Sequence, residues 1–138
     1  MKNVLLIDAT LTILFLSETY AGRTHDQRIA DVTPDPLLTG SRPLQDLSFL
    51  AFTLDHVEIL MPTRKPRGRA LTRTQKAESL RLARRCVRVE HVNSSAKRCR
   101  IVCDTSRFWK AGVRDRVMEI CSALHNFRVH LTPWQPMV

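Results

Sequence analysis

The chain has 138 residues, 43% of them hydrophobic and 25% charged, so it can build one hydrophobic core, and its composition argues against wholesale disorder. Twenty-two Lys and Arg stand against thirteen Asp and Glu, a formal net charge of +9, which favours an acidic polymer as partner, nucleic acid ahead of an anionic membrane surface. Apolar runs are far shorter than the roughly 20 residues that cross a bilayer, and Asp8 interrupts the first of them, so we expect no membrane-spanning segment, no signal peptide and a cytoplasmic location.

The first elements along the chain are two strands and a helix. Val4–Ile7 and Ile13–Leu16 are compact apolar runs, typical of buried strands, joined by a short connection. Thr24 with Gln27 three residues later is a capping-box pattern, so a short helix should follow and end before Pro34.

Two further strands are predicted in the middle of the chain. A turn-rich stretch leads to a strand that should finish at Asp46, and the next strand, Val57–Met61, is closed by Pro62. The basic segment Arg64–Arg69 contains Pro and Gly and should be a loop.

Two helices should complete the fold. Apolar residues at helical spacing predict a long helix from Thr74 to about Ile101, with a break near Asn93–Ser95. A final helix should end before Pro133. Its apolar stripe is formed by Val113, Val117, Ile120, Cys121, Leu124 and Phe127. Strands first and long helices later fit an α/β or α+β domain.

Several segments, taken together and in order, resemble consecutive landmarks of DDE superfamily transposases. They are Leu5–Thr10, Thr19–Asp26, Leu44–Phe49 and Val89–Lys97, and the similarity continues through Leu124–Arg128. The resemblance is to the insertion-sequence branch related to Harbinger elements. It implies an α/β, ribonuclease H-like mixed sheet flanked by helices, with residues 1–138 forming a single, partial catalytic domain.

The resemblance also implies a chemistry, because such transposases cut and join DNA with three carboxylates. By resemblance these are Asp8, Asp46 and Glu90, which would be both the catalytic residues and the metal ligands. In-line attack on a phosphodiester builds charge on the entering and leaving oxygens, and two Mg²⁺ or Mn²⁺ ions can neutralise that charge. Magnesium prefers hard oxygen ligands, which acids supply.

Other residues are expected to support this site. Lys97 follows Glu90 by two helical turns and so shares its face, where it could hold a DNA phosphate, with Asn93 between them. His25 and Asp26 belong to a family pattern and are expected to support the metal ligands or the helix start. The exposed basic loop is expected to contact the DNA backbone. Its residues are Arg64, Lys65, Arg67 and Arg69.

Each of these residues also has a structural interpretation. Asp8 and Asp46 could simply form turns, in which Asp is common, and Glu90 lies among basic residues and could form a surface ion pair. The basic loop could be a solvated run. The four cysteines lack the spacing of zinc sites and are expected to be reduced core thiols. They are Cys86, Cys99, Cys103 and Cys121.

The chain departs from the family pattern in several places. A longer segment normally separates the Asp8 motif from the strand at Ile13, so we infer an internal deletion of the middle strand of the first meander. So short a link cannot join parallel neighbours, so the first pair must form an antiparallel hairpin or leave the sheet. Cys86 stands where the family has Arg, and Ser48 where it has Gly. We also expect the upstream DNA-binding region of such transposases to be absent.

Three hypotheses of function follow. The first is a metal-dependent DNA endonuclease and strand transferase active in transposition, and the second is a catalytically inactive, DNA-binding remnant of one. The third is a small RNA-binding accessory protein, which rests on charge and size alone. DNA is the expected partner, a homo-oligomer is left open, and neither a membrane nor a small-molecule cofactor is expected.

Overall fold

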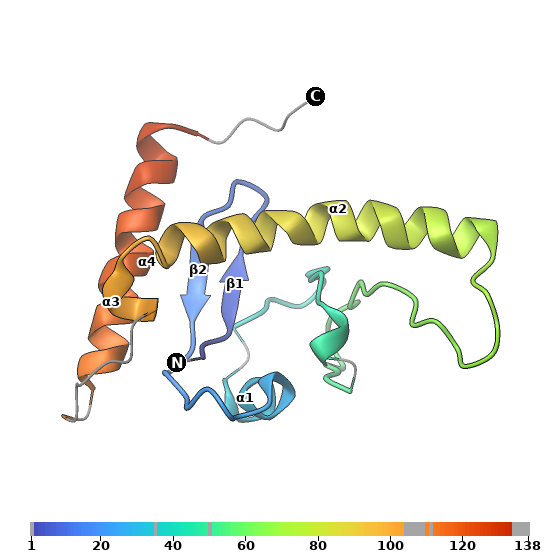
Figure 1. Cartoon of the computed structure of the whole chain (residues 1–138), viewed down its shortest axis with the longest axis horizontal. Coiled ribbons are helices and arrows are strands. Elements are labelled where there is room, and N and C mark those ends of the chain that lie inside the picture. The colour runs from blue at the N-terminus through green and yellow to red at the C-terminus, as the bar shows by residue number, and fades with distance from the viewer. Residues whose placement is uncertain (1, 35, 50, 104–109, 111, 134–138) are drawn as a thin grey trace. The chain divides into compact units, whose positions relative to one another are not determined.

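The computed structural model describes residues 2–34, 36–49, 51–103, 110 and 112–133. These residues form a mixed α/β protein with two strands, four α-helices and one 3-10 helix (Figure 1). In chain order the elements are β1 (Leu5–Ile7), β2 (Ile13–Leu16), α1 (Asp26–Val32), η1 (Leu47–Phe49), α2 (Arg73–Ala96), α3 (Arg100–Cys103) and α4 (Val113–Leu131). The chain divides into a first unit, Met1–His25 with Val89–Val138, and a second unit, Asp26–Arg88. None of the helices within the described ranges has the length and apolar character needed to cross a bilayer.

The first unit is built on the β1–β2 hairpin. The strands are antiparallel, with Leu5 opposite Leu16, Leu6 opposite Phe15, and an irregularity before Ile7 pairs with Ile13. A bridge between Lys2 and Tyr20 extends the pair. The predicted strands and their antiparallel pairing are therefore confirmed.

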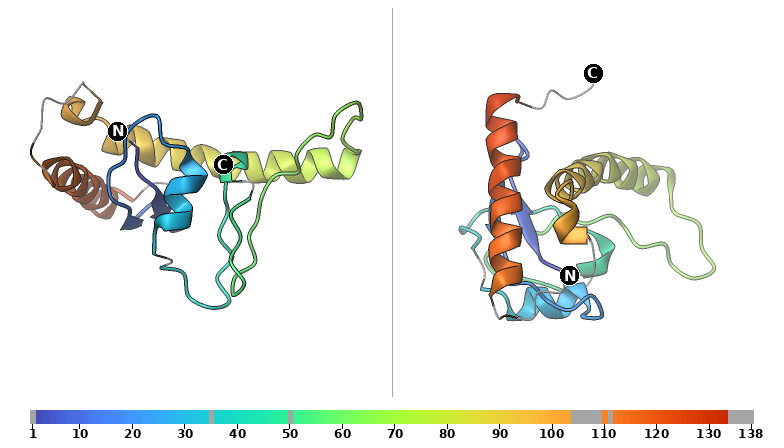
Figure 2. Two further views of the ribbon diagram at one scale, coloured as in Figure 1. Left: turned by 90° about the horizontal axis from the view of Figure 1, so that it is seen from below. Right: turned by 60° about the vertical axis from the view of Figure 1, so that its left-hand side comes forward.

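Helices enclose this hairpin with two apolar clusters. Val92, near the C-terminal end of α2, is fully buried and clusters with Leu11 and Ile13. A second cluster joins Val102 of α3 to Met118 and Cys121 of α4. Both views in Figure 2 show the hairpin beside α4. The first cluster thus packs Leu11, in the loop after β1, against α2, and the second packs against Leu16 of β2.

The last helix has the predicted bounds but a different buried face. The predicted stripe included Ile120, Leu124 and Phe127, yet these side chains are 60%, 47% and 60% exposed. Cys121 of the predicted stripe is buried, and the other buried residues of the helix are Met118, Ser122 and His125. The two strands give α4 a narrow surface to cover, and polar contacts to that surface rotate the helix away from its apolar stripe.

The second unit confirms α1 but not the two central strands. Ile29 and Ala30 are buried in α1, which ends at Val32, before Pro34 as predicted. The predicted strands ending at Asp46 and spanning 57–61 are wrong, because their described residues form a single parallel bridge, between Leu44 and Leu60. Pro43 has no N–H to donate, and Pro62 ends the second segment, so the ladder cannot extend.

Helix α2 begins one residue earlier than predicted and ends earlier, at Ala96. The Thr72 hydroxyl accepts from the Gln75 N–H at 3.2 Å, and Gln75 Oε1 accepts from the Thr72 N–H at 3.0 Å. This reciprocal capping box starts the helix. The break predicted near Asn93–Ser95 lies slightly later, because the helix continues to Ala96 before a turn leads to α3. The predicted apolar face of its first half is exposed. That face consists of Ala77, Leu80, Ala83 and Val87.

Candidate active site

Asp8 closes the loop between β1 and β2 with one of its carboxylate oxygens. Oδ1 accepts hydrogen bonds from the Thr10 N–H at 2.8 Å, the Thr10 hydroxyl at 2.6 Å and the Thr12 N–H at 2.9 Å. The structure gives Oδ2 no hydrogen-bond partner among the residues it describes. Asp8 therefore does form a turn, and its second oxygen stays available to a ligand.

These hydrogen bonds determine the protonation of Asp8. Burial raises the pKa of Asp8, but the hydrogen bonds from the Thr10 hydroxyl and from the Thr12 and Thr10 amides outweigh it and lower the pKa below the ordinary value of 3.8. Asp8 is therefore fully ionised at neutral pH. An ionised carboxylate is the form that a hard cation binds.

The lowered pKa of Asp8 predicts a pH dependence of stability. The unfolded chain binds the proton first, so the contribution of Asp8 is fully present above the ordinary pKa and is lost as the pH falls through the lowered, folded-state value. We expect Asp8→Asn, which keeps an acceptor oxygen but cannot titrate, to lose less stability than the native chain in acid. Urea unfolding from pH 6 to pH 2 measures this difference. Equal pH profiles for the two proteins would contradict the prediction.

Helix α4 holds the Asp8 loop through two neighbouring polar residues. His125, 3% exposed, donates from Nε2 to the carbonyl of Leu11 at 2.8 Å, and Leu11 adopts a left-handed backbone with φ of 69°. Asn126 accepts from the Ile13 N–H at 2.8 Å and donates to the Ile13 carbonyl at 2.9 Å. Both belong to the segment Leu124–Arg128, whose positioning role was not predicted from the sequence.

Asp46 lies in the second unit and caps a short helix. Its Oδ1 accepts from the Leu47 N–H at 2.6 Å, its carbonyl accepts from the Phe49 N–H at 3.1 Å, and its side chain is exposed. Asp8 and Glu90 belong to the first unit, so the meeting of three carboxylates stays a prediction. Within neither unit do the described residues include a group of three or more His, Cys, Asp or Glu that could hold a metal ion.

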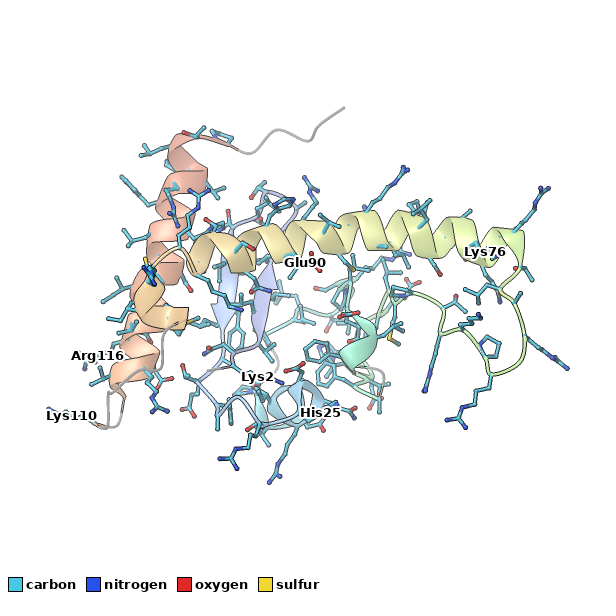
Figure 3. All side chains as sticks on the ribbon, in the orientation of Figure 1. Lys2, His25, Lys76, Glu90, Lys110 and Arg116 are labelled. Carbon is cyan, nitrogen blue, oxygen red and sulfur yellow. The ribbon has the colours of Figure 1, made fainter. Side chains whose placement is uncertain are left out.

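Glu90 is exposed on α2 (Figure 3). The structure gives it neither a hydrogen bond nor an ion pair among the described residues, so the predicted surface ion pair is not found there. Asn93 is half-buried one turn later, and its carbonyl accepts from the Lys97 N–H at 3.0 Å. This bond continues the helical turn past Ala96. That Lys97 shares the face of Glu90 and holds a DNA phosphate there stays a prediction.

Two of the supporting residues expected from the resemblance are neighbours in the sequence. His25 is the last residue of the first segment, and Asp26 begins α1. An acid in the first turn of a helix is stabilised by the helix dipole, which agrees with the structural interpretation of Asp26. Their support of metal ligands remains a prediction, as does that of Asn93.

The basic loop is present as predicted. Its four cationic side chains are exposed, and Gly68 has a positive φ of 76°, which a glycine adopts without strain. Those side chains are Arg64, Lys65, Arg67 and Arg69. Their role in binding DNA remains a prediction.

The described cysteines pack as thiols. Cys86, Cys99 and Cys121 are not in disulfides, and the Cys103 side chain lies outside the described residues, as does that of Ser48. Burial and a hydrogen bond with Cys99 raise the pKa of Cys121 to about 11, so it stays protonated at neutral pH. A protonated buried thiol is a packing group and a poor metal ligand.

Comparison with known proteins identifies a family. A family model described as DDE superfamily endonuclease matches residues 1–126. The matched residues include Asp8, Asp46 and Glu90 and extend to Asn126. No curated protein and no solved structure matches the chain significantly. Endonucleases of this superfamily cut DNA and generally use divalent metal ions.

Proposed function

Because the chain belongs to the DDE superfamily endonuclease family, we propose that it is a metal-dependent DNA endonuclease and strand transferase of the transposase type. We assign it to the insertion-sequence, Harbinger-related branch. The family match over residues 1–126 is the observation that carries this proposal. The carboxylate of Asp8 is ionised, and its hydrogen bonds go to Oδ1 and leave Oδ2 for a metal ion, which agrees with the proposal.

Three carboxylates would hold the metal ions in this proposal. Asp8 offers Oδ2, Glu90 offers both of its oxygens, and Asp46 is exposed with its Oδ1 on the Leu47 amide. Such hard, anionic oxygens fit Mg²⁺ or Mn²⁺. When bound, the ions would neutralise charge on the entering and leaving oxygens of the phosphodiester.

The chain's own residues orient this site. Thr10 and Thr12 hold Oδ1 of Asp8, which fixes the direction of its other oxygen. His125 and Asn126 anchor the loop on α4. Lys97, near the face of Glu90, would hold a DNA phosphate. Preorganised charge of this kind lowers the barrier without rearrangement during the reaction.

We further propose that the fold is a shortened ribonuclease H-like sheet and that residues 1–138 are one partial catalytic domain. Five residues separate β1 from β2, where the family has a longer segment. An internal deletion accounts for this short link and for the antiparallel pairing.

A second candidate function is a catalytically inactive, DNA-binding remnant. The short link after Asp8 supports it, because the loss of a strand would leave a smaller sheet to position the carboxylates. Cys86 and Ser48 support it as well, because they replace residues that the family conserves in its pattern. Salt-sensitive DNA binding without cleavage would distinguish this candidate from the first.

Nicking of supercoiled plasmid tests the proposed function. We expect the purified chain to nick the plasmid with Mg²⁺ or Mn²⁺ and not with EDTA. Asp46→Asn should slow nicking at least about a hundredfold, because a lost metal ligand costs several kcal/mol of transition-state stabilisation. Asp55→Asn, another exposed acid of the same unit, should nick at the native rate. A native chain that does not nick with either metal would exclude active catalysis.

A further inference from the structure

The basic residues of this protein are concentrated in one stretch of the second unit. Residues 64–88 hold ten of the 22 Lys and Arg and one acid, Glu78. Every one of these basic side chains except Arg88 is exposed. The stretch runs from the basic loop through the first four turns of α2, so its charge extends well beyond the loop.

Three of these arginines form one face of α2. Arg81, Arg84 and Arg85 are spaced by three and four residues, which places them within about 100° of arc on a helix. Arg73, two turns earlier, extends the same side. Along the axis, Arg81 and Arg85 are separated by about 6 Å. Their guanidinium groups can therefore reach neighbouring phosphates of a single strand, which follow each other every ~3.4 Å of duplex axis.

The side chains of this face have no ionic partner among the described residues. The structure gives Arg81, Arg84 and Arg85 neither an ion pair nor a side-chain hydrogen bond in the part of the chain that it describes. Arg42 in the same unit differs, because its Nε lies 2.9 Å from Oε2 of Glu58. Like charges one turn apart destabilise a helix. An anionic partner that binds this face would reduce the repulsion between its arginines.

We propose that the Arg81–Arg84–Arg85 face of α2 is a docking surface for the phosphate backbone of duplex DNA, distinct from the three carboxylates. The identity of the partner rests on the proposed function, whereas the surface itself rests on the spacing, exposure and lack of internal partners of the arginines. Guanidinium groups pair with phosphate oxygens in bidentate fashion. Contacts of this kind position a protein on DNA without reading its sequence.

The salt dependence of DNA binding tests this surface. The full chain, in EDTA so that no cleavage occurs, binds a fluorescent 25-base-pair duplex, and its affinity is measured by anisotropy at several salt concentrations. Replacing Arg81, Arg84 and Arg85 together by Gln should reduce the slope of log affinity against log salt by about 2.7, because each lost phosphate contact removes about 0.9. Gln has nearly the helix propensity of Arg, and circular dichroism checks that α2 is retained.

A charge-matched variant separates this face from general electrostatics. Arg23→Gln, Arg28→Gln and Arg116→Gln together remove the same charge from exposed positions elsewhere. This variant should change the slope by less than about 1. Equal slopes for the two triple variants would overturn the proposal, since diffuse charge would then explain binding.

Three other outcomes are decisive. Binding of an RNA hairpin at least tenfold tighter than of the DNA duplex would overturn the assignment of the partner. A DNA slope that falls as expected in a chain that never nicks would support the docking surface while the catalytic proposal fails. Normal nicking with an unchanged slope would support the catalytic proposal and overturn the docking surface.

Discussion

Replacing Glu90 by Gln is expected to slow metal-dependent nicking by about a thousandfold while leaving the free energy of unfolding unchanged. Glu90 is exposed and has no partner among the described residues. Its whole negative charge is therefore available to a cation, whereas Asp46 already shares one oxygen with the Leu47 amide. The amide of Gln preserves size and helix propensity but not charge. Plasmid nicking and urea unfolding of the same preparation measure both effects.

Glu78→Gln is the matched control for this prediction. Glu78 lies on the same helix, three turns earlier, and is also exposed. We expect this variant to nick and unfold as the native chain does. If Glu90→Gln nicks as fast as Glu78→Gln, Glu90 is not a metal ligand.

Local sequence signals predicted the elements whose stabilisation is local. The apolar runs of β1 and β2 predicted two strands, and the short link between them left an antiparallel hairpin or departure from the sheet; the structure has the hairpin. The capping pattern before α1 predicted where this helix begins, and the prolines after α1 and α4 predicted where these helices end. In each case residues that are close in the sequence determine the local structure.

The sequence predicted strands wrongly where strand formation depends on a partner that is distant in the sequence. The segments around Leu44 and Leu60 have strand-like composition, yet proline and side-chain contacts reduce them to one bridge. Gln45 uses its side-chain amide to bind the carbonyls of Phe49 and Phe52 at 3.1 and 3.3 Å, which stabilises a turn. Strand formation needs a partner strand, and composition alone does not supply one.

The same distinction applies to the candidate site. The turn at Asp8 follows from an Asp with hydroxyl residues after it, a local pattern. The contacts of His125 with Leu11 and of Asn126 with Ile13 join residues more than a hundred positions apart. Periodicity favoured the apolar stripe of α4 and so pointed to the wrong face. The signal that could have found these two residues was their place in the segment Leu124–Arg128, where polar side chains interrupt an apolar helix.

Loss of Asn126 is expected to cost a large part of the stability. Replacing it by Ala leaves both the N–H and the carbonyl of Ile13 without their partners at 2.8 and 2.9 Å. Unpaired polar groups in a largely buried position cost about 1–3 kcal/mol each, so we expect a loss of roughly 2–4 kcal/mol in the free energy of unfolding. Urea denaturation measures the loss. Nicking should fall as well at temperatures where the variant remains folded, because the Asp8 loop loses an anchor.

Two variants separate the hydrogen bonds of Asn126 from the general tolerance of α4. Asn126→Asp keeps an acceptor for the Ile13 N–H but places a second acceptor against the Ile13 carbonyl, so we expect it to be no more stable than Asn126→Ala. Glu119→Ala, at an exposed position on the same helix, should change stability by less than about 0.5 kcal/mol. If Asn126→Ala is as stable as Glu119→Ala, the bonds of Asn126 to Ile13 do not hold the hairpin on α4, and the His125 bond to Leu11 together with apolar packing around Val92 must position Asp8.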